Sequence, residues 1–97
     1  MKPLTTDLDS QERRPYFLWD EDLSVAELRQ RLTSGPATER RRLLAKLLRE
    51  AKDTDVWRFT SPQQVADELD RLGPMLGRRR AFWFYLIEGW RRDGLIR

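Results

Sequence analysis

Cysteine and histidine are both missing from this chain of 97 residues. Without cysteine there are no disulfides and no thiolate metal ligands, which is typical of proteins from a reducing compartment. Without histidine the chain lacks the side chain that most often serves as general base and as metal ligand. Long apolar runs are missing too, and the first residues, MKPLTTDLDSQERR, lack the apolar segment of a signal peptide. We therefore expect a soluble, cytoplasmic protein with no membrane partner.

The remaining side chains offer little for catalysis. There is no glycine-rich phosphate loop. The carboxylates of residues 20–22 are contiguous, so they cannot all point at one centre. Asp67 and Asp70 share a helix face, an arrangement that is far more often solvated or paired with arginine than metal-binding. Lys46 is expected on an exposed helix side, where it would not be activated. The sequence predicts no enzyme activity, no catalytic residue, no cofactor and no metal.

Charge is abundant and unevenly distributed. Charged residues make up 36% of the chain, and the net charge is +3. Residues 1–35 carry 5 basic and 7 acidic side chains, whereas residues 77–97 carry 6 basic and 2 acidic ones. This distribution favours a polarised surface for a charged partner, although a solvated surface of mixed charge explains it as well.

Capping signals and apolar spacing predict two helices in the first half of the chain. Ser24 and Glu27 form a capping box that starts the first helix, and Gly35 ends it. The second helix covers about residues 36–52. Its inward face is expected to consist of Leu43, Leu44, Leu47, Leu48 and Ala51.

Two more helices are expected in the second half. The third starts with Ser61 as its N-cap and Pro62 in its first turn, and Val65, Leu69 and Leu72 mark its inward face. The fourth covers about residues 78–92 and stops at Gly94. The segment DTDVWRFT before the third helix is expected to be a buried connector and not a paired strand, because no second strand candidate exists.

The N-terminal part lacks helical periodicity. Residues 1–14 are polar, so we expect a disordered or loosely attached tail. Tyr16, Phe17 and Trp19 need burial and are expected to lie across the helices as an extended arm, which ends where residues 20–22 meet water. The fold class predicted is all-α, a single small domain of about four helices over residues 15–97.

The last helix is apolar around most of its circumference. Its best-spaced apolar stripe consists of Phe82, Tyr85, Leu86, Gly89 and Trp90. Trp83, Phe84 and Ile87 widen that stripe. A helix of this kind is normally central and covered by neighbours on several sides. The alternative is that part of the flank formed by Trp83, Phe84 and Ile87 stays exposed and binds a partner.

Three consecutive arginines, Arg78, Arg79 and Arg80, are expected in the first turn of this helix. There the helix dipole disfavours each exposed cation by about 0.3–1 kcal/mol. They either pair with acidic residues 67–70 of the preceding helix or bind phosphates or an acidic partner. The candidate partner- or phosphate-binding residues are Arg78, Arg79, Arg80, Arg91, Arg92, Trp83 and Phe84.

Part of the chain resembles a winged helix-turn-helix. SPQQVADEL is similar to the first helix of that motif, and GWRRDGLIR to the exit from a recognition helix. In that arrangement residues 78–80 would lie at the end of the helix that reads DNA. The connector LGPMLG is longer than the three or four residues that the motif prefers. The resemblance implies a small DNA-binding regulator.

A second resemblance covers most of residues 15–97. The ordered segments PYFLWDED, LLAKLLREAKDTDVWRF, SPQQV and RRRAFWFYLIEGWRR resemble a family of small, uncharacterised, all-helical bacterial proteins. Members are often encoded beside an AbiE-type nucleotidyltransferase toxin. The resemblance implies a non-catalytic interaction module, an antitoxin-like accessory whose protein partner is that nucleotidyltransferase. It implies no residue roles, and an antitoxin of this kind can also bind its own operator DNA.

Overall fold

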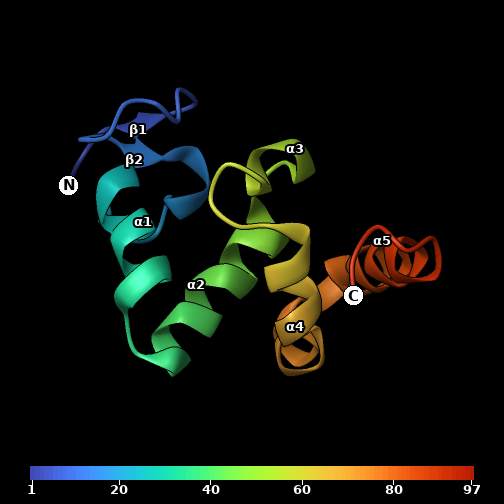
Figure 1. Cartoon of the computed structure of the whole chain (residues 1–97). Helices are drawn as coiled ribbons and strands as arrows, with labels where there is room; N and C mark the ends of the chain where they lie inside the picture. Colours follow the sequence, from blue (N-terminus) through green and yellow to red (C-terminus); the bar gives the residue numbers. More distant parts are fainter.

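The chain folds around one central helix, α2 (Ala37–Glu50), in a computed structural model that describes residues 1–97. Helices α1 (Val25–Ser34) and α4 (Pro62–Leu72) pack against α2, and α5 (Arg80–Arg92) lies beyond α4 at one side of the molecule (Figure 1). Helical turns account for 63% of the residues, which confirms the expected all-α class. None of the helices combines the length and the apolar character that crossing a membrane requires.

The starts of α1 and α4 follow the predicted capping chemistry. Ser24 Oγ accepts a hydrogen bond from the backbone N–H of Glu27, and the Glu27 carboxylate accepts one from the Ser24 N–H, both 3.1 Å long. At α4, Ser61 Oγ accepts from the Gln64 N–H at 3.2 Å, and Pro62 occupies the first turn. Because these caps satisfy N–H groups that the helix leaves free, they fix where each helix begins.

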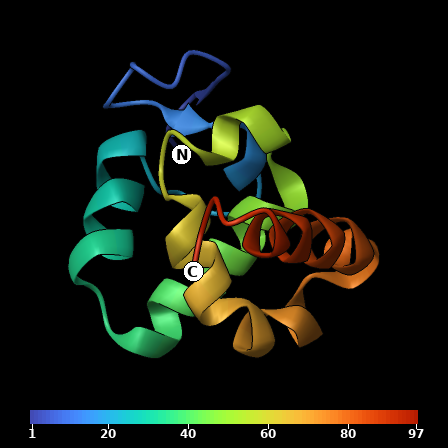
Figure 2. The same ribbon diagram turned by 45° about the vertical axis from the view of Figure 1, so that its right-hand side comes forward.

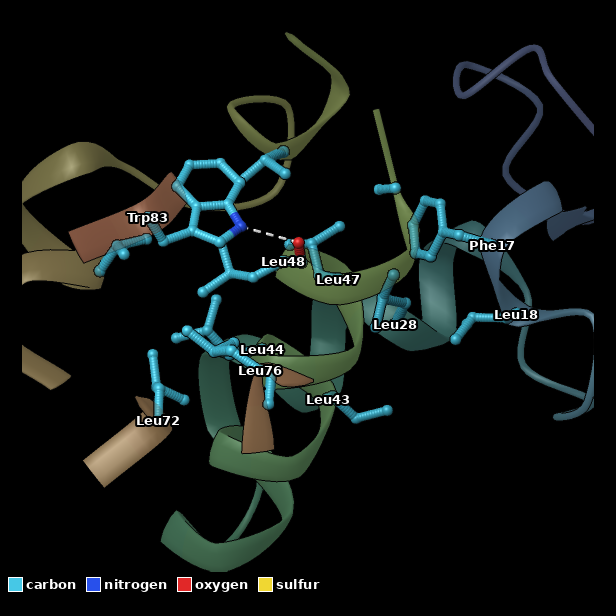
Figure 3. Close-up of a cluster of buried hydrophobic side chains, with 14 of the residues drawn as sticks. Phe17, Leu18, Leu28, Leu43, Leu44, Leu47, Leu48, Leu72, Leu76 and Trp83 are labelled. Atoms are coloured by element: carbon cyan, nitrogen blue, oxygen red, sulfur yellow. Dashed lines mark hydrogen bonds between the residues drawn. The ribbon is translucent and has the colours of Figure 1, made fainter. Parts of the chain in front are cut away.

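The core lies between α2 and its neighbours (Figure 3). All five residues predicted for the inward face of α2 are buried. The three predicted for the third helix, now α4, are buried as well. The predicted connector is a single helical turn, α3 (Asp53–Val56), and not a strand. Val56 in α3 is fully buried, while Trp57 and Phe59 are half-buried against the core.

The N-terminal segment is packed onto the domain, so the prediction of a loose tail over residues 1–14 is wrong. Strand β1 (Leu4–Thr5) pairs in parallel with β2 (Arg14–Pro15), and Leu8 is buried in the core. The buried Arg14 guanidinium donates hydrogen bonds to three backbone carbonyls, those of Lys2, Leu18 and Trp19. Such contacts satisfy a buried charge and leave no periodic pattern in the sequence.

The aromatic segment that follows is not extended. Residues Tyr16–Leu18 form a 3₁₀ turn that buries Phe17, whereas Trp19 is 60% exposed. Tyr16 Oη donates to Asp55 Oδ2 at 2.6 Å and accepts from the Lys52 N–H at 2.9 Å. The turn thereby ties the N-terminal segment to the start of α3.

Helix α5 is not the axis of the core, and its inward face differs from the predicted stripe. Trp83 and Ile87 are fully buried, and Trp83 Nε1 donates to the Leu48 carbonyl at 2.8 Å (Figure 3). Tyr85, expected inside, is 78% exposed, and Phe82 is 38% exposed. One face of α5 therefore packs on the domain, and the opposite face is free.

Candidate binding surface at the start of helix α5

The turn between α4 and α5 positions the three consecutive arginines. Two 3₁₀ turns, Gly73–Met75 and Gly77–Arg79, join the helices. Gly77 has φ +54°, a conformation that suits glycine because it has no Cβ. Between the two turns, Leu76 is fully buried and anchors the connection to the core. The α-helix begins at Arg80, two residues later than predicted, so only the last arginine lies in α5 itself.

These arginines, residues 78–80, form what we call the arginine cluster, and none of them makes an ion pair within the chain. Their expected acidic partners are engaged elsewhere or stand apart. Glu68 Oε2 accepts from Arg41 Nε at 2.9 Å and lies 3.9 Å from Arg71 Nη1. Asp67 accepts a hydrogen bond from Gln63. Pairing with α4 therefore does not explain the cluster.

Aromatic rings hold two guanidinium groups of the cluster in place. The Arg79 Cζ lies 4.9 Å from the Phe82 ring centroid and 5.7 Å from that of Trp83. The Arg80 Cζ lies 4.3 Å from the centroid of Phe84. Stacking on a ring leaves the N–H edge of a guanidinium free, and this planar edge matches a carboxylate or phosphate. The cluster thus presents ordered cations without an anion.

Gly73 makes room for one of these stacks. A Cβ at this position would lie 3.2 Å from Arg80 Nε and 3.3 Å from the Phe84 ring. Its φ is not in the left-handed region, so close approach is the reason for glycine here. The turn thus lets Arg80 and Phe84 lie directly against its backbone.

The other predicted site residues do not join the cluster. Arg91 Nη2 donates to the Ala66 carbonyl at 2.8 Å and Arg91 Nε to the Arg97 carbonyl at 3.0 Å, so Arg91 holds the end of the chain against α4. Arg92 is exposed and unpaired, but it lies roughly 18 Å along the helix from Arg80. Trp83 is internal and cannot contact a partner. Phe84 is half-buried and supports Arg80.

The acidic residues 20–22 form part of an ion-pair network that the sequence analysis missed. Lys46 is buried, contrary to expectation, and its ammonium contacts Asp20 and lies 2.9 Å from Glu21 Oε2. Arg42 donates two hydrogen bonds to Glu21, at 3.0 and 2.8 Å. Hydrogen bonds from Arg42, followed by Lys46, hold the pKa of Glu21 at about 2 although burial opposes this shift. The acidic front is therefore largely neutralised within the chain.

The surface has two hollows, and both are bordered by groups that already have partners. One, of about 280 Å³, lies between α1, α2 and α4, and the Arg41–Glu68 ion pair is on its border. The other, of about 370 Å³, lies along α2 beside Gly77. There Arg49 donates to the Met75 carbonyl at 2.9 Å. No group of three acidic side chains is placed to hold a metal ion.

Apart from Arg92 at the far end of α5, the arginine cluster is thus the part of the predicted site that the structure leaves accessible and without an anion. Arg78 has no side-chain partner, and its two neighbours have only aromatic ones. What the cluster binds has to be inferred from its own chemistry, because comparisons with known protein families, curated proteins and solved structures find no match to this chain.

Proposed function

We propose that this chain is a non-catalytic interaction module whose arginine cluster binds an acidic surface of a protein partner. The observation that supports this most directly is the absence of any intramolecular anion at residues 78–80. Six of the thirteen other arginines form ion pairs, including two of the three in the chain's other run of arginines, residues 40–42. The paired ones are Arg31, Arg41, Arg42, Arg49, Arg58 and Arg71.

The position of the cluster makes an external anion the natural complement. The free N–H groups at the start of α5 carry partial positive charge, so unpaired cations there cost stability. Arg79 is the N-cap residue of α5, and no side chain caps this helix. A carboxylate from a partner would interact favourably with both the guanidinium groups and the helix end.

A protein partner fits the surroundings of the cluster better than duplex DNA. The exposed face of α5 next to the cluster carries Phe82, Tyr85 and Glu88. Direct readout in the major groove uses polar side chains that match base edges, and a carboxylate facing the duplex is repelled by phosphates. The seven residues between α4 and α5 also exceed the turn of a helix-turn-helix. A DNA-binding regulator is the competing proposal.

Within the protein-binding proposal, the partner is the nucleotidyltransferase toxin of a neighbouring gene. The resemblance of the aromatic segments to an antitoxin-like family supports this choice, as does charge complementarity. A nucleotidyltransferase holds its metal ions with carboxylates in the active cleft. Arginines with free planar edges are suited to occupy such a cleft as bidentate partners. In this role the chain suppresses the toxin without chemistry of its own.

Reversing the cluster with Arg78→Glu, Arg79→Glu and Arg80→Glu should abolish copurification with the neighbouring gene product and protection from its toxicity. A charge-assisted hydrogen bond contributes about 1.5–3 kcal/mol, and about 1.4 kcal/mol corresponds to a factor of ten in affinity. We therefore expect an affinity loss of about a hundredfold or more. The variant should melt no lower than the original chain, since glutamate suits a helix start.

The matched control reverses Arg13, Arg40 and Lys52, three exposed cations without ion pairs elsewhere on the chain. It changes the net charge equally and should leave binding and protection intact. Equal losses in both variants would mean that only net charge matters, and the cluster would be rejected as the binding site. If the cluster variant instead loses salt-dependent binding to its upstream DNA and no protein copurifies, the DNA-binding proposal holds.

A further inference from the structure

Helix α5 carries a second exposed feature on its outer face. Phe82, Tyr85 and Gly89 follow one another at intervals of three or four residues, so they share one side of α5. The same spacing reaches Arg78 in the preceding 3₁₀ turn and Asp93 just after the helix. The Asp93 N–H donates to the Gly89 carbonyl at 3.0 Å, so Asp93 continues the helical path by one residue. We call these five residues the outer stripe.

The chain leaves most of the outer stripe uncovered, although the Arg79 guanidinium stacks on its Phe82 ring. The residues after α5 fold back toward α4, on the side of Arg91 (Figure 2). Arg97 is held there by hydrogen bonds with Gln63 in α4. Tyr85 therefore remains 78% exposed, beside the partly exposed ring of Phe82. Aromatic residues are enriched at the centres of binding surfaces, so this pair offers a contact for a partner.

No contact within the chain explains why residue 89 is a glycine. Glycine inside a helix costs about 1 kcal/mol relative to alanine. Its backbone needs no left-handed conformation, and an added Cβ would meet only the tip of the Arg92 side chain, 3.6 Å away. The glycine thus leaves the helix backbone without a side chain on the outer stripe, one turn beyond Tyr85.

The outer stripe is complementary to itself when two copies run antiparallel. Phe82 and Gly89 lie at equal distances on either side of the midpoint between Tyr85 and Leu86, and so do Arg78 and Asp93. We propose that two copies of this chain pair through antiparallel α5 helices about a twofold axis at this midpoint. Each Phe82 ring then packs on the bare backbone at Gly89 of the second copy. At both ends, Arg78 forms an ion pair with Asp93 of the second copy.

A second copy fits this stripe better than other occupants do. A parallel pair of helices would place arginine beside arginine at one end and aspartate beside aspartate at the other. A purely acidic partner would meet Asp93 with like charge. The twofold arrangement pairs both charges and uses the same surface on each copy, which is the commonest form of oligomer. Arg80 stacks on Phe84 outside this contact and remains available to the partner of the proposed function, while the Arg79 guanidinium lies at its edge on the Phe82 ring.

The contact is expected to be reversible. Stable interfaces bury roughly 1,200–2,000 Å² in total, and a single pair of helices supplies only part of this area. Sedimentation equilibrium over a wide range of protein concentrations measures the association. The mass should rise from the monomer value of 11.6 kDa toward twice that value as concentration increases.

Gly89→Gln tests the contact between Phe82 of one copy and Gly89 of the other. Glutamine has room within the chain and is the better helix former, so the monomer should melt at the same or a higher temperature. Its side chain would occupy the space for Phe82 of the second copy, so dimerisation should weaken at least about tenfold, a change of about 1.4 kcal/mol. If Gly89 had no role in dimerisation, Gly89→Gln would raise the stability of the monomer and leave the dimer unchanged. A dimer that persists in this variant therefore overturns the proposal.

A charge swap tests the orientation. Arg78→Asp and Asp93→Arg should each weaken the dimer, because each places like charges together at both ends. The double variant should restore association close to that of the original chain. Glu88→Arg, with the same charge change beside the stripe, serves as the control and should have little effect. An original chain that stays monomeric at the highest soluble concentration, or a swap that restores nothing, would contradict the antiparallel pair. Arg80→Glu changes no residue that touches the stripe, so the partner proposal can fail independently in this variant.

Discussion

Replacing Trp83 by alanine is expected to lower the free energy of unfolding by about 3–5 kcal/mol. The side chain is fully buried and packs edge-on against Trp57, with ring centroids 5.7 Å apart. Its removal would leave a cavity and deprive the Leu48 carbonyl of its hydrogen-bond donor. Because small domains are stabilised by only about 5–15 kcal/mol, chemical denaturation should show a variant close to unfolding at ambient temperature.

Two further substitutions separate the hydrogen bond of Trp83 from the packing of its ring and test the exposed face of α5. Trp83→Phe keeps an aromatic ring but removes the N–H donor, so we expect a smaller loss of about 1–3 kcal/mol. Tyr85→Ala, measured at concentrations where the chain is monomeric, should change stability by no more than about 0.5 kcal/mol because the side chain is mostly exposed. Equal losses at positions 83 and 85 would show that the inward face of α5 is assigned incorrectly.

Lowering the pH should remove a second large contribution to the free energy of unfolding, that of the Glu21 carboxylate. Hydrogen bonds from Arg42 are the main cause of its low folded pKa of about 2, compared with an ordinary value of 4.5. A carboxylate with a lowered folded pKa stabilises the protein fully above its unfolded pKa and loses this effect as the pH falls toward the folded value. Glu21→Gln should therefore cost about 1–3 kcal/mol at pH 7. The difference should shrink below about pH 4.5, become small at pH 2 and vanish only below it.

Glu12 provides the comparison for this experiment because it is exposed and forms no ion pair. Glu12→Gln should leave the dependence of unfolding free energy on pH unchanged. The ion-pair network of Glu21, Arg42 and Lys46 would be refuted if Glu21→Gln and the original chain kept a constant stability difference between pH 7 and pH 2.

The features that were predicted correctly depend on residues that lie close together in the sequence. The capping residues Ser24 and Ser61 mark the true starts of their helices because each bonds an N–H three residues ahead. The apolar face of α2 is narrow, so only one orientation of the helix buries it, and the structure has this orientation. The all-α class followed from these local signals.

The inward face of α5 was not predictable in the same way. Its apolar residues surround the helix, so spacing alone allows several orientations. The orientation of α5 depends on Trp83. Its indole N–H donates to the Leu48 carbonyl near the end of α2, thirty-five residues earlier in the chain. Contacts over such separations have no periodic signature.

Long-range ion pairs account for the remaining differences. Lys46 was expected in solvent because charged residues on α2 alternate with leucines, yet Asp20 and Glu21 approach it from the N-terminal segment. Nothing in the sequence around Arg14 indicated that its side chain would hold residues 1–14 against the domain. For the candidate site, sequence identified the arginine cluster, and only the structure showed that the acidic residues of α4 do not pair with it.

Photo-crosslinking from Ala81 is the most direct measurement of whether the arginine cluster faces a protein partner. This residue is exposed and immediately follows the cluster, so a photoreactive side chain there leaves all three arginines in place. In the cells that make the chain, we predict a crosslink to one acidic protein, the product of the neighbouring gene. It should be lost at high salt and in the Arg79→Glu, Arg80→Glu background. The same probe at Gln30, exposed on α1, should not capture this protein. Crosslinks to DNA, or identical products from both positions, would contradict the account.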